Sequence, residues 1–320
     1  MESTNGYFIS RCVALHFALL LCSTLLYSGN RNHRVERIIL SYKEASTGEK
    51  MKLYMLCDME GCSGIYLPEQ IETTADRPEL YQEGRKLMTL DVNSAAQAAL
   101  DAGVDELWVA DTHNGGGVNI FWDQVLVDDR IIYEAPQVST LMPSLDQSFD
   151  GLILLGHHAK AGTLGAFLDH TWSSEEWFDF QINGVSVGEI GIETCYAGHW
   201  NVPLIMVQGD AACCREVNDQ FPWAITAEVK RAVGRNRAAG PAPELARRRT
   251  AEKVKLAVEK LREGHFKPYR PDLPMTIRFT ATRTSIVESI ARKPNVHRID
   301  GRTVEARVDL HCDILRWLTE

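Results

Sequence analysis

Residues 51–64, MKLYMLCDMEGCSG, contain a short apolar segment followed by two acidic side chains and a glycine. The segment from Lys52 to Cys57 is mostly apolar and is bounded by a glycine turn, which is the pattern of an interior strand in a parallel sheet. Side chains alternate along a strand, so Asp58 and Glu60 can point to the same side. Ligands of open α/β sheets bind outside the carboxyl ends of the strands. The two carboxylates therefore predict a metal site or an acid/base pair, to which the rest of the chain supplies partners.

Strand-like and helix-like segments alternate over residues 51–210. The further predicted strands are 106–110, 130–133, 151–155 and 203–207, and the predicted helices are 79–102 and 190–198. This alternation is typical of a mainly parallel sheet covered by helices on both faces, the three-layer α/β/α class. Within 178–189, Asn183-Gly184 separates two alternating runs and predicts a β-hairpin.

The chain after residue 210 changes character. Residues 231–249 are rich in arginine and contain Gly240-Pro241-Ala242-Pro243, which favours a linker or a surface loop. A helix is predicted over 244–263. Residues 275–320 follow the pattern of a strand, a helix, a hairpin around Asp300-Gly301 and a final helix. We therefore expect an α/β domain over 51–265 and a smaller α+β lobe over 266–320.

Residues 1–50 differ from the rest of the chain. The apolar run from Cys12 to Tyr27 is shorter than the about 20 apolar residues that a membrane span needs. It resembles the apolar region of a signal peptide, but Glu2 and a lone Arg11 precede it and no A-x-A cleavage site follows it. The leading interpretation is that the ancestral protein starts at Met51. Residues 1–50 are then an N-terminal extension, and a wrongly assigned start site is one form of this interpretation. A signal or anchor segment and a folded element are the alternatives.

Charge and cysteine content narrow the classes of function and location. The 320 residues carry a net charge of −9, which argues against nucleic acid, because nucleic-acid binding favours a basic surface. The eight cysteines include the adjacent Cys213 and Cys214 but no CxxC pair. This usage indicates neither a zinc ribbon nor a disulfide framework. A reducing compartment, and therefore a cytoplasmic location, is the expectation.

Metal-type ligands recur at the ends of the predicted strands. They are Asp58, Glu60, His113, His158 and Glu189. Neighbouring strand ends of such a sheet converge on one crevice. Two histidines with three carboxylates suit zinc or manganese rather than calcium, which prefers oxygen ligands. Five ligands exceed one tetrahedral zinc and fit two ions about 3.5–4 Å apart, with Asp58 as the bridging carboxylate.

Each of these residues also has an ordinary structural explanation. A carboxylate after a strand is often a helix N-cap, and His157 or His158 can be a hydrogen-bonded core histidine. Asp91 and Asp210 are interpreted as solvated or capping residues. The motifs of zincins, α/β-hydrolases, P-loop proteins and dinucleotide-binding proteins are absent from the sequence. A metal site is favoured because metal-type ligands occur at four predicted strand ends.

The same residues resemble the zinc-dependent D-aminopeptidase family associated with dipeptide-transport operons. The match begins at Met51 and runs to near the C terminus. Besides 51–64, the blocks that carry it, in order, are ADTH at 110–113, LGHHAKAG at 155–162, LDHTW at 168–172 and INGVSVGEIGIE at 182–193.

This resemblance implies roles for six residues. Five match the ligands of a binuclear zinc centre, with two zinc ions per chain: Asp58, Glu60, His113, His158 and Glu189. His170 matches the histidine to which the family's catalytic role is assigned. The implied fold is a three-layer α/β/α domain with a smaller α+β lobe, assembled as a large ring-shaped homo-oligomer. Two segments depart from the family pattern. The extension 1–50 affects the expected location, and the arginine-rich 231–249 affects the expected oligomer.

The implied function is a cytoplasmic metal-dependent aminopeptidase. It would hydrolyse short peptides with a free N-terminal residue of D configuration, using water activated by two zinc ions. The expected partner is a short peptide substrate, with no nucleic acid and no membrane. The alternatives are an L-specific aminopeptidase, a two-metal phosphohydrolase and a metal-free peptide-binding component of transport. A phosphohydrolase would need Arg or Lys beside the ligands, and those blocks are poor in both apart from Lys160.

Overall fold

The computed structural model describes residues 50–319 except 74–75 and 136–140. Residues 50–320 form one compact unit, and the expectations for residues 1–49 lie outside the described residues. Within the described part of the chain, no helix is both long enough and apolar enough to cross a membrane.

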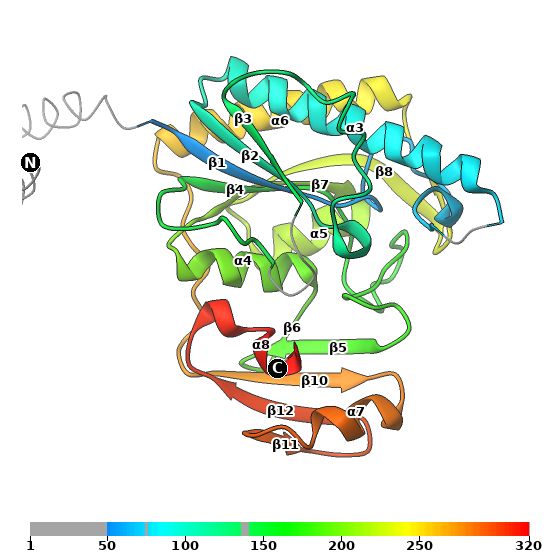
Figure 1. Ribbon diagram of the computed structural model, residues 1–320, viewed down its shortest axis with the longest axis vertical. Coiled ribbons are helices and arrows are strands. Elements are labelled where there is room, and N and C mark those ends of the chain that lie inside the picture. Colours follow the sequence, from blue (N-terminus) through cyan, green and yellow to red (C-terminus); the bar gives the residue numbers. More distant parts are fainter. Residues whose placement is uncertain (1–49, 74–75, 136–140, 320) are drawn as a thin grey trace, which may run out of the picture. The chain divides into compact units, whose positions relative to one another are not determined.

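A seven-stranded sheet forms the centre of the larger part of the molecule (Figure 1). Its strands, in spatial order, are β3 (Ile131–Glu134), β2 (Glu106–Asp111), β1 (Lys52–Cys57), β4 (Gly151–His157), β7 (Leu204–Asp210), β8 (Ile225–Gly234) and β9 (Arg237–Ala239). All neighbours pair in parallel except β9, which lies antiparallel to β8 at one edge. The central strands are buried along nearly their whole length, as their continuous apolar runs predict.

Helices cover both faces of this sheet (Figure 1). One face packs against α3 (Pro78–Asp101) and α6 (Pro243–Arg262), and the other against α4 (Glu189–His199) and α5 (Ala211–Gln220). The predicted three-layer α/β/α class is confirmed. Proline in the first turn starts α3 and α6, and Gly103, with φ of 85°, follows the end of α3.

A second sheet of five antiparallel strands lies beyond α4 (Figure 1). Its order is β11 (Val296–Arg298), β12 (Thr303–Val308), β10 (Met275–Ala281), β5 (Trp177–Ile182) and β6 (Val185–Val187). Two short helices, α7 (Thr284–Ile290) and α8 (Arg316–Thr319), belong to the same part of the chain. The remaining helical elements are the 3-10 turns η1 (Pro68–Gln70), η2 (His113–Gly115) and η3 (His311–Asp313).

The predicted hairpin at Asn183-Gly184 is confirmed as β5–β6, and it belongs to the second sheet. This sheet therefore takes two strands from the middle of the chain as well as the predicted strand and hairpin of 275–308. A division into 51–265 and 266–320 stays a prediction, and the strands of the second sheet lie on both sides of residue 265.

The interpretation of 231–249 as a linker or loop is wrong. Strand β8 continues to Gly234, a tight turn leads into β9, and α6 starts at Pro243. Most of the arginines that suggested a loop are exposed, but Arg247 of α6 is half-buried against Asp91. Pro243 is a helix start rather than a loop residue. The predicted helix over 244–263 is confirmed.

Two glycines allow the loop after β1 to touch the end of β4. The amide of Gly61 donates to the carbonyl of Gly156 at 2.6 Å, and the amide of Asp58 donates to Leu155 at 2.8 Å. A Cβ atom at Gly61 would lie 2.0 Å from the carbonyl oxygen of His157. A Cβ atom at Gly156, where φ is +77°, would lie 2.1 Å from the carbonyl oxygen of Asp58. Only glycine permits this backbone contact, which brings the acidic loop against the residues that follow β4.

We expect Gly61→Ala to lower the free energy of unfolding by about 1–3 kcal/mol, because the added methyl group overlaps backbone atoms that cannot rotate away. Urea unfolding followed by circular dichroism measures the change. Gly234→Ala is the matched control, since nothing lies within 4 Å of its Cβ position and its φ is not in the left-handed region. A Gly61→Ala protein as stable as the Gly234→Ala protein would contradict the proposed backbone contact.

Candidate metal centre

Four of the predicted site residues lie where three neighbouring strands end. Asp58 and Glu60 follow β1, His113 is the first residue of η2 after β2, and His158 directly follows β4. The chain runs outward from β1 to β2 and β3 and then returns to the other side of β1 with β4. The residues therefore converge at the point where the strand order reverses, which is the usual ligand position in such sheets.

Glu189 reaches the same place by a different route. It was expected at a strand end, but β6 stops at Val187 and Glu189 is the first residue of α4. A carboxylate is favoured in this first helical turn because the backbone amides there carry partial positive charge. Its Oε1 accepts a hydrogen bond from the amide of Trp172 at 2.8 Å, which fixes the side chain toward the sheet.

The described residues form three groups of candidate ligand atoms: two share Asp58, and the third consists of Glu60, His158 and His170. In the first, Nδ1 of His113 lies 2.9 Å from Oδ1 of Asp58 and 3.2 Å from Oε2 of Glu60. In the second, Nε2 of His158 lies 3.5 Å from Oδ2 of Asp58 and 3.2 Å from Oε1 of Glu189. Each group offers three ligand atoms within 4.8 Å of one another. The two oxygens of Asp58 thus face different histidines, as a bridging carboxylate would.

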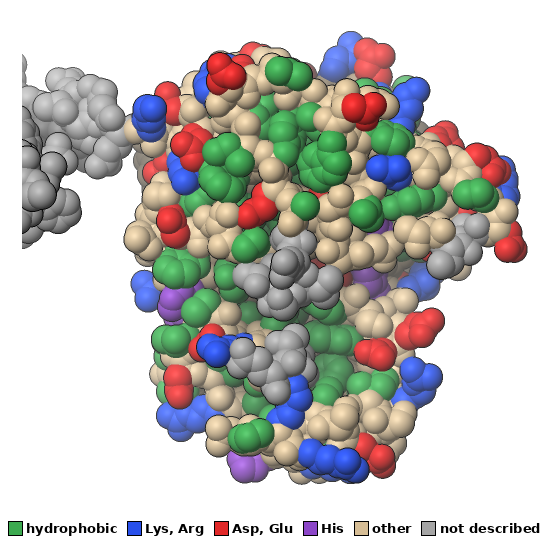
Figure 2. Space-filling view, viewed as in Figure 1, with side chains coloured by type: hydrophobic (Ala, Val, Ile, Leu, Met, Phe, Trp, Pro, Cys, Tyr) green, Lys and Arg blue, Asp and Glu red, His purple; other side chains and the backbone are tan. Residues whose placement is uncertain are grey.

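His170 lies across these two groups. Its ring stacks on that of His158 with centroids 3.9 Å apart and an interplanar angle of 13°. Its Nε2 is 3.6 Å from Oε1 of Glu189 and 4.0 Å from Oε1 of Glu60. The His170 side chain is 17% exposed, compared with 2% for His158. His170 is therefore more open to solvent than the histidine beneath it. In Figure 2, histidine side chains (purple) are visible between the upper and the lower part of the view.

The outer nitrogen of each histidine is held by a backbone carbonyl. Nε2 of His113 pairs with the carbonyl of Ile71 at 3.0 Å, and Nδ1 of His158 pairs with that of Ala159 at 3.1 Å. Nδ1 of His170 pairs with the carbonyl of Leu168 at 2.9 Å. A carbonyl oxygen only accepts, so the outer nitrogen must carry the proton in each ring. In the neutral rings the inner nitrogens keep a free lone pair, which is the arrangement of metal-binding histidines.

Burial and charge act against each other in this cluster. Burial alone would lower the pKa of His113 and of His158, but the facing carboxylates raise both well above the usual value. Burial would raise the pKa of Glu189, but His158 and His170 lower it to about 2. For Asp58, burial and the charge of Glu60 together raise the pKa. Carboxylates crowded in a dry site need positive charge, and bound divalent ions can supply it in place of protons.

Two buried atoms test whether the residues fit a metal. Nε2 of His158 and Oε2 of Glu60 have no hydrogen-bond partner within the described residues. A buried polar atom without a partner is costly unless another ligand satisfies it. Imidazole nitrogen and carboxylate oxygen are both ligands of zinc. The donor set and its unpartnered atoms therefore fit zinc.

Several residues that hold the site in place have no signal in the sequence. Asn119 ties the glycine loop 115–117 to Asp111. Its backbone amide donates to Oδ2 of Asp111 at 2.8 Å, and its side-chain Nδ2 donates to the carbonyl of His113 at 2.6 Å. On the other side, Arg235 at the β8–β9 turn holds the loop of His170. Its Nε lies 3.0 Å from Oδ1 of Asp169, and its carbonyl accepts from the amide of Leu168 at 2.8 Å.

The two aspartates outside the predicted ligand set differ in role. Asp210 caps α5 as expected, because Oδ1 accepts from the amide of Cys213 at 2.8 Å. The interpretation of Asp91 as solvated or capping is wrong. It is fully buried on α3 and accepts from the amide of Ser63 and from Nε2 of Gln208, each at 2.8 Å. Its position four residues before Ala95, on the buried face, was the available signal.

His157 is a buried core histidine, one of the ordinary explanations considered above. Its Nε2 lies 2.8 Å from Oε2 of Glu193, and both side chains are almost fully buried. Glu193 follows Glu189 by one helical turn on α4. Two successive histidines at the end of β4 therefore face two glutamates of α4, and the pair of His157 and Glu193 links the strand to the helix.

Comparison with known proteins agrees with this geometry. A model of the D-aminopeptidase family matches residues 51–319. The chain is 32% identical over 221 residues to a D-aminopeptidase of Bacillus subtilis (strain 168), covering 69% of this chain and 78% of that protein. A solved structure described as a zinc-dependent D-aminopeptidase from Bacillus subtilis, a self-compartmentalizing protease, has a TM-score of 0.77 at 27% identity, covering 84% of this chain and 96% of that one. The fold, the order of the site residues along it and this family match together show that the chain belongs to the D-aminopeptidase family.

Proposed function

We propose that this protein is a zinc-dependent aminopeptidase that releases N-terminal D-residues from short peptides. The observation that carries the proposal is the pair of ligand groups joined by Asp58. One ion would be held by Asp58, Glu60 and His113, and the other by Asp58, His158 and Glu189. Three protein ligands for each ion leave coordination positions open, as catalytic zinc sites require.

The chemistry divides between the bound ions and the chain. When bound, two zinc ions supply Lewis acidity, which polarises the scissile carbonyl and makes a nearby water acidic enough to attack at neutral pH. The carboxylates Asp58, Glu60 and Glu189 would offset three of the four positive charges of two zinc ions, and the open positions can take the free amino group of a peptide but not a blocked one. Burial of the ligands excludes bulk water and so strengthens each of these interactions.

We propose His170 as the catalytic residue. Its Nδ1 donates to the carbonyl of Leu168, so its Nε2 is the atom presented to the site. In the neutral ring this atom can accept a proton from the reacting groups, and once protonated it can donate a hydrogen bond to the oxyanion. It is the more exposed member of the stacked pair with His158, which suits a residue that meets substrate.

Location and assembly belong to the same proposal. The six cysteines of the described residues are all free, which fits a reducing compartment such as the cytoplasm. The structural relative is described as a self-compartmentalizing protease, and we propose a ring-shaped homo-oligomer for this chain as well. The phosphohydrolase alternative would need Arg or Lys to hold a phosphate. In the described part of the chain, the six site side chains form hydrogen bonds and ion pairs only with one another, with the backbone and with Asn114.

The first test measures metal and specificity on the same preparation. Purified protein should contain close to two zinc ions per chain, and removal of zinc with a chelator should abolish peptidase activity until zinc is restored. Among matched aminoacyl p-nitroanilides, the D-alanyl substrate should be cleaved with a higher kcat/KM than the L-alanyl substrate. The N-acetylated D-alanyl compound is the control, and it should not be cleaved because it lacks a free amino group.

Each alternative gives a different result in this test. Full activity with only trace metal would contradict the zinc site. Preference for the L-alanyl substrate would support the L-specific alternative. A zinc-loaded protein that cleaves p-nitrophenyl phosphate but no aminoacyl substrate would support the phosphohydrolase.

The second test separates the proposed catalytic residue from a proposed ligand. His170→Ala should lower kcat by about 10²–10⁴-fold, the scale for loss of a positioned acid/base or oxyanion donor, while KM and zinc content change little. His113→Ala should lose both zinc and activity. Steady-state kinetics and elemental analysis of the two variants provide the comparison. A near-normal kcat for His170→Ala, or loss of zinc equal to that of His113→Ala, would show that the role assigned to His170 is wrong.

A further inference from the structure

The loop that carries two of the proposed ligands is both irregular and buried. Every residue from Asp58 to Ile65 is buried, although the segment has no regular secondary structure. Buried backbone amides and carbonyls must find partners inside the protein. The amides of Gly61 and Ser63 donate to the carbonyl of Gly156 at 2.6 Å and to Oδ2 of Asp91 at 2.8 Å.

The carbonyls of this loop converge on one side chain from a distant strand. Nζ of Lys230, on β8, donates to the carbonyl of Cys62 at 2.9 Å, to that of Ile65 at 2.6 Å and to that of Glu60. An ammonium group has three N–H donors, and here each has an acceptor. The planar fork of an arginine could not converge on three carbonyls in this way, so lysine suits this position.

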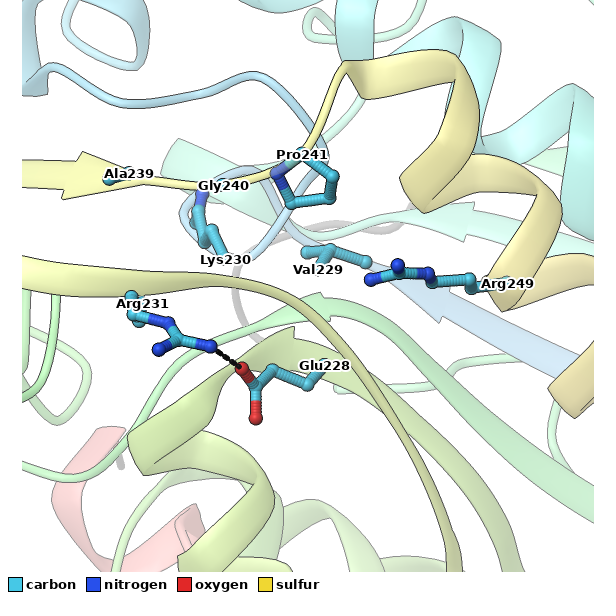
Figure 3. Close-up of a pocket in the computed structure, with 8 residues that line it drawn as sticks. All are labelled: Glu228, Val229, Lys230, Arg231, Ala239, Gly240, Pro241 and Arg249. Carbon is cyan, nitrogen blue, oxygen red and sulfur yellow. Dashed lines mark ion pairs between the residues drawn. The ribbon is translucent and has the colours of Figure 1, made fainter.

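Lys230 is unusual for a lysine in its surroundings. It is 2% exposed, and its Nζ lies 4.7 Å from the centre of the Phe167 ring. Within the described residues it forms no ion pair, so the loop carbonyls take the place of a carboxylate. Figure 3 shows its neighbour Arg231 directed instead toward Glu228, with the two groups 3.5 Å apart. Arg231 is exposed, so the two successive cations of β8 differ in environment.

We propose that Lys230 is a positioning residue for one half of the metal centre. By holding three carbonyls of residues 60–65, it fixes the backbone from which the Glu60 carboxylate reaches its group. This inference rests on the proposed function, because it assumes that Glu60 binds a metal ion together with Asp58 and His113. The group formed by Asp58, His158 and Glu189 does not include Glu60, although Glu60 also lies within 4.8 Å of His158 and His170 in the third group.

The two halves of the centre should therefore respond differently to loss of Lys230. Without the ammonium group, three buried carbonyls lose their partner and the loop must shift to find others. His158 is held by β4, and Glu189 is held by α4 and by the amide of Trp172, so neither depends on this loop. Asp58 is tied to β4 through its own amide, which donates to Leu155 at 2.8 Å. Loss of Lys230 should weaken one zinc ion and spare the other.

Lys230→Met in the full-length chain tests this expectation, because methionine keeps an unbranched apolar stem and removes the donors. After equilibration with a zinc-buffering chelator, zinc content should fall from about two ions per chain to about one. The affinity of the lost ion should drop about 10–100-fold, the scale for removing a group that orients a metal ligand. Arg231→Met is the matched control, one residue along the same strand, and it should keep both ions.

Two combined variants identify which ion is lost. Glu60→Gln alone should remove one ion, and adding Lys230→Met to it should remove no more, because both changes act on the same group. Adding Lys230→Met to Glu189→Gln should leave no tightly bound zinc, because the two changes then act on different groups. This double-variant comparison separates positioning of Glu60 from a general loss of stability.

Lys230→Gln, which keeps two N–H donors, is the milder variant if Lys230→Met does not fold. In this variant, the ion held by Asp58, Glu60 and His113 should bind with an affinity between those of the wild type and of Lys230→Met. Retention of both ions at wild-type affinity in a folded Lys230→Met or Lys230→Gln protein would overturn the proposal. Equal weakening of both ions, or failure of both variants to fold, would also overturn it, since Lys230 would then be a general structural residue. Wild-type protein with only trace zinc is a separate result, which refutes the proposed function itself.

Discussion

The site depends on one close contact between two pieces of backbone. The loop after β1 lies directly on the end of β4, with the amide of Gly61 on the carbonyl of Gly156 at 2.6 Å. Side chains larger than hydrogen at either position would overlap backbone atoms of the other segment. The contact places Asp58 where each of its oxygens faces a different histidine. A wider separation would give two unrelated clusters instead of a joined pair, so the chemistry of the site follows from a steric constraint.

Around this contact, the outer nitrogens of the site histidines and the carbonyls of the loop have hydrogen-bond partners, whereas two atoms directed into the site form no hydrogen bond within the part of the chain that the structure describes. The outer nitrogens of His113, His158 and His170 each pair with a carbonyl. The loop carbonyls pair with Lys230. Within the described residues, the atoms left without partners include Oε2 of Glu60 and Nε2 of His158, which both face the centre. Such a distribution orients the ligands before any ion binds, which lowers the cost of binding it.

The sequence predicts the layers, and it selects the candidate ligand side chains that the structure brings together, but it does not predict the residues that hold them in place. Continuous apolar strands and a helical period are local patterns, and the acidic and histidine residues follow directly after them. Arg235 lies in the stretch 231–249, whose arginine content suggested a loop, and Lys230 directly precedes it, yet they hold the loops of His170 and Glu60 respectively. Apart from the carboxylate of Asp169, the partners that hold these loops are backbone groups more than 60 residues away, and a backbone carbonyl has no identity in a sequence. Asp91 differs, because a polar residue on an apolar helix face is visible beforehand.

Glu189 shows why the second sheet matters to the site on the first. Its helix, α4, packs on both sheets: Ile190 and Ala197 belong to the core of the seven-stranded sheet, whereas Ile192 and Cys195 belong to that of the second sheet. The hairpin β5–β6 leads directly into α4, so the second sheet sets where the helix begins. The buried pair of His157 and Glu193 then ties α4 to β4 one turn further on. The second sheet therefore acts on the centre through the start of this helix, which presents the carboxylate of Glu189 to His158 at 3.2 Å.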